Sequence, residues 1–85
     1  MRYSIVVLPS AERDLRGLPS REWTRIRDRI DALGENPRYV GSQKLQGHKD
    51  RYRARCGDYR ILYRIDDADH EVIVYAVGHR KDVYR

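Results

Sequence analysis

Basic residues gather in one quarter of this chain, with types and spacings that suit the binding of a polyanion. Residues 43–64 contain seven lysines and arginines but only two aspartates, a local excess of five positive charges that equals the formal net charge of the whole chain. The seven are Lys44, Lys49, Arg51, Arg53, Arg55, Arg60 and Arg64. Tyrosines lie between several of them, and their rings can stack on bases. A positive surface this concentrated favours RNA or DNA as the partner.

The arginines fall into two rows with strand-like spacing. Alternation along residues 52–56 places Arg53 and Arg55 on one face of a strand, and alternation along residues 59–65 does the same for Arg60 and Arg64. A tight turn at Gly57 and Asp58 would make the two rows neighbours. Four guanidinium groups on one sheet face repel one another unless an anion neutralises them. Phosphate is the expected anion because the arginine fork donates two hydrogen bonds to it. The alternative is a solvated basic face, partly paired with nearby aspartates.

The tail that follows the last expected strand contains residues that could complete a catalytic site. Cleavage of RNA without a metal requires activation of a 2′-hydroxyl, protonation of the leaving 5′-oxygen and stabilisation of charge on the phosphorus oxygens. Arg60 and Arg80 suit the last task. His79 has a side chain whose ordinary pKa of about 6.5 suits proton transfer near neutrality, and Tyr84 could donate a proton or stack on a base. The alternatives are a strand-end histidine and a tyrosine of the core.

Signatures of metal and cofactor chemistry are missing from the sequence. It contains no CxxC, HExxH, EF-hand loop, P-loop or G-x-S-x-G motif, so neither a cofactor nor a metal is expected. An acidic run, made of Asp66, Asp67, Asp69 and Glu71, could suggest a divalent ion but is more typical of a solvated turn. The single cysteine, Cys56, alternates onto the core face and cannot form a disulfide within the chain. No apolar run is long enough to span a bilayer and no targeting segment is visible, which favours a cytoplasmic protein without a membrane partner.

The elements that position these residues read as one domain of the α+β class, residues 1–85. A β-branched strand at 3–8 is followed by a short helix that Ser10 caps and Gly17 ends. The second helix is capped by Ser20, ends at Gly34, and carries an apolar stripe of Trp23, Ile26, Ile30 and Leu33. Strands at 52–56, 59–65 and 71–79 complete the order βααβββ, which predicts a mostly antiparallel four-stranded sheet with a helical hairpin packed on one face.

These residues resemble a known protein family. The segment KLQGHKDRYRARCGDYRILYRIDD, followed by VIVYAVGHRKDVY, is similar to the RelE/ParE superfamily of toxins, and specifically to its RelE-like branch. The shared pattern is L-x-G, then Y-R-x-R-x-G-x-Y-R-x-x-Y, then G-H-R-x-x-x-Y. The similarity covers nearly the whole chain, from the first strand to the C-terminal tyrosine.

The resemblance implies a toxin of a type II toxin–antitoxin system that cuts mRNA in the ribosomal A site by metal-independent 2′-hydroxyl attack. It implies that Arg60 and Arg80 stabilise the transition state and that Tyr84 orients a base. Arg53 and Arg55 match two lysines of the family that contact phosphates, and Lys44, Lys49 and Arg51 would extend the hold on mRNA and 16S ribosomal RNA. A guanidinium releases its proton reluctantly, so His79 is the expected group for proton transfer. The resemblance also implies a hetero-oligomer with a cognate antitoxin.

Two other activities fit the same family. ParE-like toxins share the fold and inhibit DNA gyrase without being enzymes, and a catalytically inert homologue could serve as a binding module. The complete set of Arg53, Arg55, Arg60, Arg80 and Tyr84 favours RNA cleavage.

Overall fold

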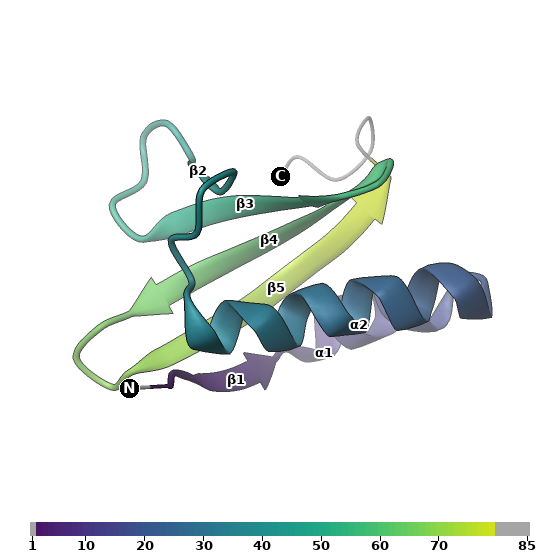
Figure 1. The fold of residues 1–85 in the computed structure, drawn as a ribbon, viewed down its shortest axis with the longest axis horizontal. Helices are drawn as coiled ribbons and strands as arrows, with labels where there is room; N and C mark the ends of the chain where they lie inside the picture. The colour runs from purple at the N-terminus through teal and green to yellow at the C-terminus, as the bar shows by residue number, and fades with distance from the viewer. Residues whose placement is uncertain (1, 80–85) are drawn as a thin grey trace.

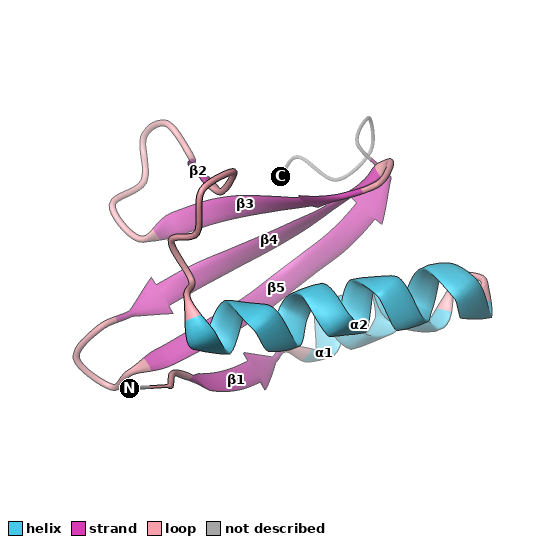
Figure 2. Cartoon of the chain, in the orientation of Figure 1, coloured by secondary structure: helices cyan, strands magenta, loops and turns pink. Residues whose placement is uncertain are grey.

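In the part of the chain that the structure describes, two helices cover one face of a five-stranded sheet (Figures 1 and 2). The structure is a computed structural model that describes residues 2–79. The elements are β1 (Ser4–Val7), α1 (Pro9–Arg16), α2 (Ser20–Glu35), β2 (Gln43–Lys44), β3 (Arg51–Cys56), β4 (Tyr59–Asp66) and β5 (Glu71–His79). The predicted α+β class and the helical hairpin on one face are confirmed. Within the described residues, no helix is both long enough and apolar enough to cross a membrane.

The strand order is β1-β5-β4-β3-β2. The three long strands β3, β4 and β5 are antiparallel neighbours, whereas β1 is parallel to β5. The predicted sheet lacked one strand. The short β2 pairs Gln43 with Arg53 and Lys44 with Tyr52, and two residues are too few to show any alternation in the sequence.

A proline stands at the N-terminal end of each helix, and neither of the serines expected as caps is the N-cap. Pro9 is the first residue of α1 and Leu8 is its N-cap, while Pro19 is the N-cap of α2. Proline suits the start of a helix because its φ is preset and its missing N–H has no partner to lose there. The predicted caps Ser10 and Ser20 are therefore wrong. The Ser10 hydroxyl instead donates a hydrogen bond of 2.7 Å to the carbonyl of Tyr75.

The core lies between the helices and one face of the sheet. The stripe predicted for α2 contributes Ile26, Ile30 and Leu33, all buried, while Trp23 is half-buried at its edge. The sheet contributes Ala54, Ile61, Tyr63, Val72 and Val74, among others. The hydroxyl of Tyr63, the largest fully buried side chain, donates a hydrogen bond of 2.6 Å to the carbonyl of Pro37. Burial raises the pKa of Tyr63.

Helix α1 protects the part of β5 that β1 leaves unpaired. Pairing between β1 and β5 ends at Val7 and Val74. Beyond this point the backbone N–H of Val77 donates a hydrogen bond of 3.0 Å to Oδ2 of Asp14, and the Ser10 bond satisfies the Tyr75 carbonyl. An uncovered strand edge invites pairing with another chain. Polar side chains of α1 thus replace a neighbouring strand.

A β-bulge shifts the alternation of β5. Tyr63 lies opposite Val74, but Leu62 lies opposite Ala76, so Tyr75 is an extra residue in β5. Before the bulge, residues with even numbers face the helices; after it, Val77 faces them and Ala76 faces away. One residue inserted into a strand reverses the face of every residue that follows.

The segment that follows α2 is tied to the sheet by a second set of polar contacts. The guanidinium of Arg38 donates two hydrogen bonds, of 2.7 and 3.2 Å, to the carboxylate of Asp67 in the turn between β4 and β5. The hydroxyl of Tyr3 donates a third, of 2.6 Å. Hydrogen bonds from Arg38 and then from Tyr3 lower the pKa of Asp67 to about 2. The acidic turn is thus partly an anchor rather than only a solvated loop.

Candidate nucleic-acid interface

The sheet face that the helices leave open carries the two predicted rows of arginines. Tyr52, Ala54 and Cys56 of β3 pack in or against the core, so Arg51, Arg53 and Arg55 face away from the helices. On β4, Ile61, Tyr63 and Ile65 belong to the core, which leaves Arg60 and Arg64 on the open face. The register places Arg55 directly opposite Arg60 and Arg51 directly opposite Arg64. The predicted alternation and hairpin are confirmed.

Apolar side chains form a buried floor between these arginines. Leu62 is 0% exposed and Ala76 is 1% exposed although both lie on the face away from the helices. Leu45 from the loop after β2 and Tyr75 from the bulge pack against them. The Nε atoms of Arg60 and Arg64 are buried as well. Charged groups beside a dry apolar surface interact more strongly with an anion than the same groups in water.

Partners within the protein hold several of the arginines in place. Nε of Arg64 lies 3.5 Å from Oδ2 of Asp50. The guanidinium of Arg51 lies over the ring of Tyr75, 5.1 Å from its centroid, and Arg53 donates a hydrogen bond to Oε1 of Gln43. Arg55 is exposed, and no ion pair or hydrogen bond from residues 2–79 holds its side chain. The alternative of a solvated basic face that is paired within the protein therefore fits Arg64, which lies near Asp50, better than it fits Arg55.

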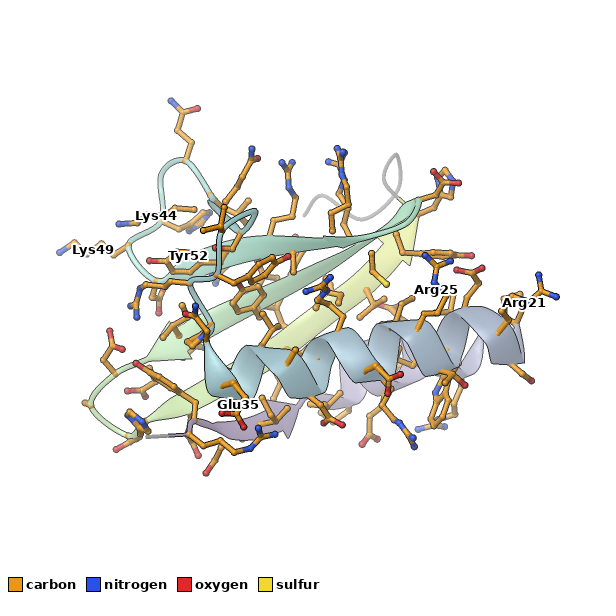
Figure 3. All side chains as sticks on the ribbon, viewed as in Figure 1. Arg21, Arg25, Glu35, Lys44, Lys49 and Tyr52 are labelled. Atoms are coloured by element: carbon orange, nitrogen blue, oxygen red, sulfur yellow. The ribbon has the colours of Figure 1, made fainter. Side chains whose placement is uncertain are left out.

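The two lysines flank this face rather than join it. Lys44 pairs with Tyr52, so it lies on the opposite side of the β2–β3 ribbon from Arg53. Lys49 lies in the loop that leads into β3, and both lysines are exposed. Figure 3 shows them at the end of the molecule farthest from Arg21. They can extend a binding surface, but the structure does not bring them to Arg55 and Arg60.

His79 lies on the side of the sheet that faces the helices. It is opposite Tyr59 in β4, and the two rings meet edge to face with centroids 5.9 Å apart. Arg60 is opposite Gly78 instead. The bulge causes this outcome, because uninterrupted alternation from Val74 would have placed His79 on the open face. Of the other predicted catalytic residues, Arg80 and Tyr84 lie outside the described residues.

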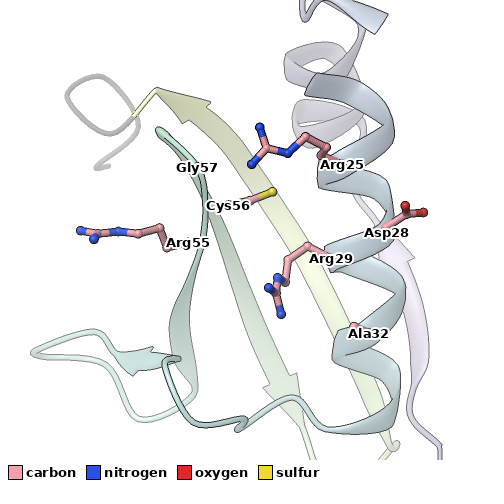
Figure 4. A pocket seen from close by; sticks show the side chains of 7 residues that line it. All are labelled: Arg25, Asp28, Arg29, Ala32, Arg55, Cys56 and Gly57. Atoms are coloured by element: carbon pink, nitrogen blue, oxygen red, sulfur yellow. The ribbon is translucent and has the colours of Figure 1, made fainter. Parts of the chain in front are cut away.

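Two arginines of α2 border the same strand from its other side, and no binding role was predicted for either of them. Arg25 and Arg29 line a hollow of about 490 Å³ between α2 and the end of β3, together with Arg55, Cys56 and Gly57. Figure 4 shows Arg25 and Arg29 extending from α2 toward β3 while Asp28 points to the other side. Cys56 is half-buried and points toward α2, as its core-side position predicted.

Carboxylates that could hold a metal ion lie at the other end of β4. Oxygens of Asp66, Asp69 and Glu71 lie within 4.8 Å of one another. Oδ1 of Asp66 also accepts a hydrogen bond of 3.0 Å from the backbone N–H of Asp69, as a turn residue does. Arg60 is near the start of β4 and Asp66 is its last residue. This acidic turn is therefore separate from the arginine face.

Comparison with known proteins supports one family over the full length. Residues 5–84 match the family described as the ParE toxin of the type II toxin–antitoxin system, parDE. The chain is 36% identical to Toxin RelG of Mycobacterium tuberculosis over 86 residues, which covers 100% of this chain and 99% of that protein. It is 31% identical to Toxin RelE of the same organism, covering 98% of this chain and 87% of that one.

Solved structures show the same fold. The toxin–antitoxin complex RelBE2 from Mycobacterium tuberculosis contains a chain that superposes with a TM-score of 0.85 at 32% identity, covering 94% of this chain and all of that one. The RelE–RelB complex from Pyrococcus horikoshii gives a TM-score of 0.81 at 29% identity, covering 96% and 99%. The isolated RelE toxin of E. coli gives 0.80 at 26% identity, covering 91% and 83%. With its arginine-bearing sheet and helical hairpin, the chain belongs to the RelE/ParE superfamily of toxins from type II toxin–antitoxin systems.

Proposed function

We propose that this toxin is a ribosome-dependent endoribonuclease that cuts mRNA in the A site. The observation that supports this most directly is the pair of Arg55 and Arg60, which lie opposite each other on an open sheet face above the buried floor of Leu62 and Ala76. Such a face can hold a phosphodiester between two guanidinium groups in a partly dry environment. Similarity to proteins named RelG and RelE supports the same activity.

The proposed reaction is transfer of a phosphodiester within the RNA. The 2′-oxygen attacks the adjacent phosphorus, the bond to the 5′-oxygen breaks, and the products are a 2′,3′-cyclic phosphate and a 5′-hydroxyl. The proton leaves the 2′-hydroxyl and a proton reaches the 5′-oxygen, so no other reactant is consumed. Arg60 and Arg80 stabilise the charge that grows on the phosphorus oxygens. Arg53 and Arg55 hold the backbone, and Lys44, Lys49 and Arg51 extend this contact along mRNA and 16S ribosomal RNA.

Proton transfer is assigned to His79 at the end of β5 and to Tyr84, rather than to the arginines of the open face. Arginines are poor bases because their pKa lies above about 12. His79 reaches the phosphate between Arg55 and Arg60 only around the end of the sheet, since it points toward the helices. Tyr84 is the remaining candidate for donating a proton or orienting the base. The chemistry proposed here therefore depends mainly on positioning and charge stabilisation.

Substitution of Arg60 tests the proposal. Arg60→Ala should lower mRNA cleavage in a translating extract by about 10²–10³-fold, the usual cost of removing a group that stabilises an oxyanion. The Nε atom of Arg60 is buried, so Arg60→Gln, which keeps most of the stem, tests whether the loss comes from unfolding rather than from the missing charge. Arg21→Gln, an exposed position on α2, is the control. Cleavage by both Arg60 variants at the rate of the unsubstituted protein would refute the assigned site.

The partner in the resting cell is proposed to be a cognate antitoxin that forms a hetero-oligomer with this chain. Two of the similar structures are complexes of a toxin with an antitoxin. A short acidic or amphipathic segment would suit a basic face, and it would order as it binds. Covering Arg60 would block access of mRNA. A toxin that acts on translating ribosomes works in the cytoplasm.

Inhibition of DNA gyrase is the second candidate, because the matching family is described by the name ParE. A supercoiling assay run beside the cleavage assay separates the two. Gyrase inhibition without mRNA cleavage would assign the chain to the ParE-like activity. Binding of ribosomes with neither effect would leave an inert homologue that serves as a binding module.

A further inference from the structure

A basic trench follows the outer edge of β3, beside the open face but distinct from it. It consists of two hollows of about 490 and 540 Å³ that share Arg29, Arg55 and Gly57. The first is bordered by Arg25 and Asp28 of α2, and the second by Tyr39, Gln43 and Arg53. Four arginines and one carboxylate thus line the trench, and Asp28 points away from β3 (Figure 4). We propose that this trench binds the phosphate backbone of a single RNA strand that continues from the cleavage site.

The edge of β3 gives the trench its floor. Strand β2 pairs only with Tyr52 and Arg53, so among the described residues no strand covers β3 from Ala54 to Cys56. The two-residue turn at Gly57 and Asp58 makes Cys56 and Tyr59 a hydrogen-bonded pair. Hydrogen-bonded and non-hydrogen-bonded pairs alternate along antiparallel strands, so the N–H of Arg55 points away from β4, toward the outer edge of β3. A backbone donor at this edge adds to the surrounding guanidinium groups. Phosphate oxygens accept both kinds of donor.

The arginines of α2 are held in position for this role. Arg29 lies over the ring of Tyr39, 5.0 Å from its centroid. One guanidinium nitrogen of Arg25 lies 3.2 Å from the point that a Cβ on Gly57 would occupy, so the side chain reaches across to the hairpin turn. Its nearest carboxylate, on Glu22, is 3.6 Å away and forms only a loose pair. Arg25 and Arg29 therefore stand on one side of the β3 edge, and Arg55 stands on the other (Figure 4).

RNA suits the trench better than an acidic peptide does. The lining contains Ala32 and Cys56 but no larger aliphatic side chain. Protein partners bind through a few large apolar or aromatic anchors that fill pockets, whereas a nucleic-acid backbone needs rows of cations with aromatic rings nearby. Tyr39 supplies such a ring. The trench also meets the proposed cleavage face at Arg53 and Arg55, so one strand could occupy both without leaving the protein.

Binding of an uncleavable RNA tests this inference, which rests on the proposed function for its substrate. The probe is ten-residue oligouridylate with 2′-O-methyl groups, which has phosphates but no nucleophile. The double variant Arg25→Gln/Arg29→Gln should bind the probe roughly 10-fold more weakly near 0.1 M salt. The magnitude of the slope of log affinity against log salt concentration should decrease by about 1.4, which is about 0.7 for each lost phosphate contact. Arg21→Gln, on the same helix but outside the trench, should leave both quantities unchanged.

The outcomes separate the trench from the cleavage site. If the unsubstituted protein binds the probe but cuts no mRNA, the proposed enzyme activity fails while loss of binding in the double variant still supports the trench. If the double variant binds like Arg21→Gln, the trench inference is wrong even when mRNA is cut. A ten-residue polyglutamate measured in parallel covers the acidic-peptide alternative. Loss of polyglutamate binding with unchanged RNA binding would assign the trench to a protein partner and overturn the inference.

Discussion

The buried hydroxyl of Tyr63 should be one of the most costly single groups to remove from this small protein. Its ring is 0% exposed, and its hydroxyl donates a hydrogen bond of 2.6 Å to the carbonyl of Pro37, which is also buried. In Tyr63→Phe no water can replace the lost donor, so the carbonyl of Pro37 keeps its full desolvation cost. The expected loss in the free energy of unfolding is about 1–3 kcal/mol. For a chain of this size each kcal/mol lowers Tm by about 4–8 °C.

Urea denaturation at neutral pH measures this loss, and the pH dependence provides a second check. Burial raises the folded-state pKa of Tyr63, so its contribution is fully present below the unfolded-state pKa of about 10. Above pH 10 the unfolded chain releases this proton first, and stability falls by up to about 1.4 kcal/mol per pH unit until the raised folded-state pKa is passed. Tyr63→Phe lacks that fall, so the gap between the two proteins should narrow as pH rises.

Tyr59→Phe is the matched control, because this half-buried tyrosine lies on the same face of β4 and its hydroxyl has no hydrogen bond to any residue among 2–79. It should change stability by less than about 0.5 kcal/mol. Equal stability of Tyr63→Phe and Tyr59→Phe at neutral pH would refute the role given to the Pro37 contact. A gap that stays constant from pH 8.5 to pH 11 would refute burial as the cause of the raised pKa.

Two further predictions concern the turns of the sheet. Arg38 and Tyr3 lower the pKa of Asp67 to about 2, so its contribution to stability is present above the ordinary carboxyl pKa of about 3.9 and is lost as pH falls toward 2. In urea titrations, the free energy of unfolding of Asp67→Asn should therefore fall less between pH 4 and pH 2 than that of the unsubstituted protein. Equal falls in the two proteins would contradict the role of Asp67 as an anchor. Gly57 has φ of +61°, so Gly57→Ala should lower the free energy of unfolding by about 1–2 kcal/mol. Gly17→Ala, at φ of −82°, should be neutral or slightly stabilising, and an equal loss for both in thermal melts would contradict this reasoning.

Much of the fold could be predicted because the chain shows clear local periods. The apolar stripe of α2 has helical spacing, and the arginines of β3 alternate with Tyr52, Ala54 and Cys56, so the side that faces the core was evident. The parallel pairing of β1 with β5 is different, because nothing local in residues 3–8 specifies a partner strand. The same holds for β2, whose two residues pair because the anchored segment after α2 brings them to β3.

The site was predictable only where a single hairpin determined it. Arg55 and Arg60 flank one short turn, so their meeting follows from the hairpin. Arg25 and Arg29 belong to the polar side of a helix, and their place beside β3 depends on how α2 packs across the sheet. When a helix borders the edge of a strand, part of its polar face can form the wall of a groove. Charge on α2 could have suggested this only after the position of the sheet edge was known.

The bulge in β5 decides which residues surround Arg60. With regular pairing continued from Tyr63 and Val74, Arg60 would lie opposite Val77, and His79 would point to the open face. The inserted Tyr75 instead places Gly78 opposite Arg60 and leaves Ala76 beside Leu62. Small residues therefore lie next to Arg60, and glycine within a strand often marks the close approach of a ligand. The irregularity thus removes an imidazole from the arginine face and places a glycine beside Arg60. Both effects suit a surface that grips a phosphodiester by charge more than one that moves protons itself.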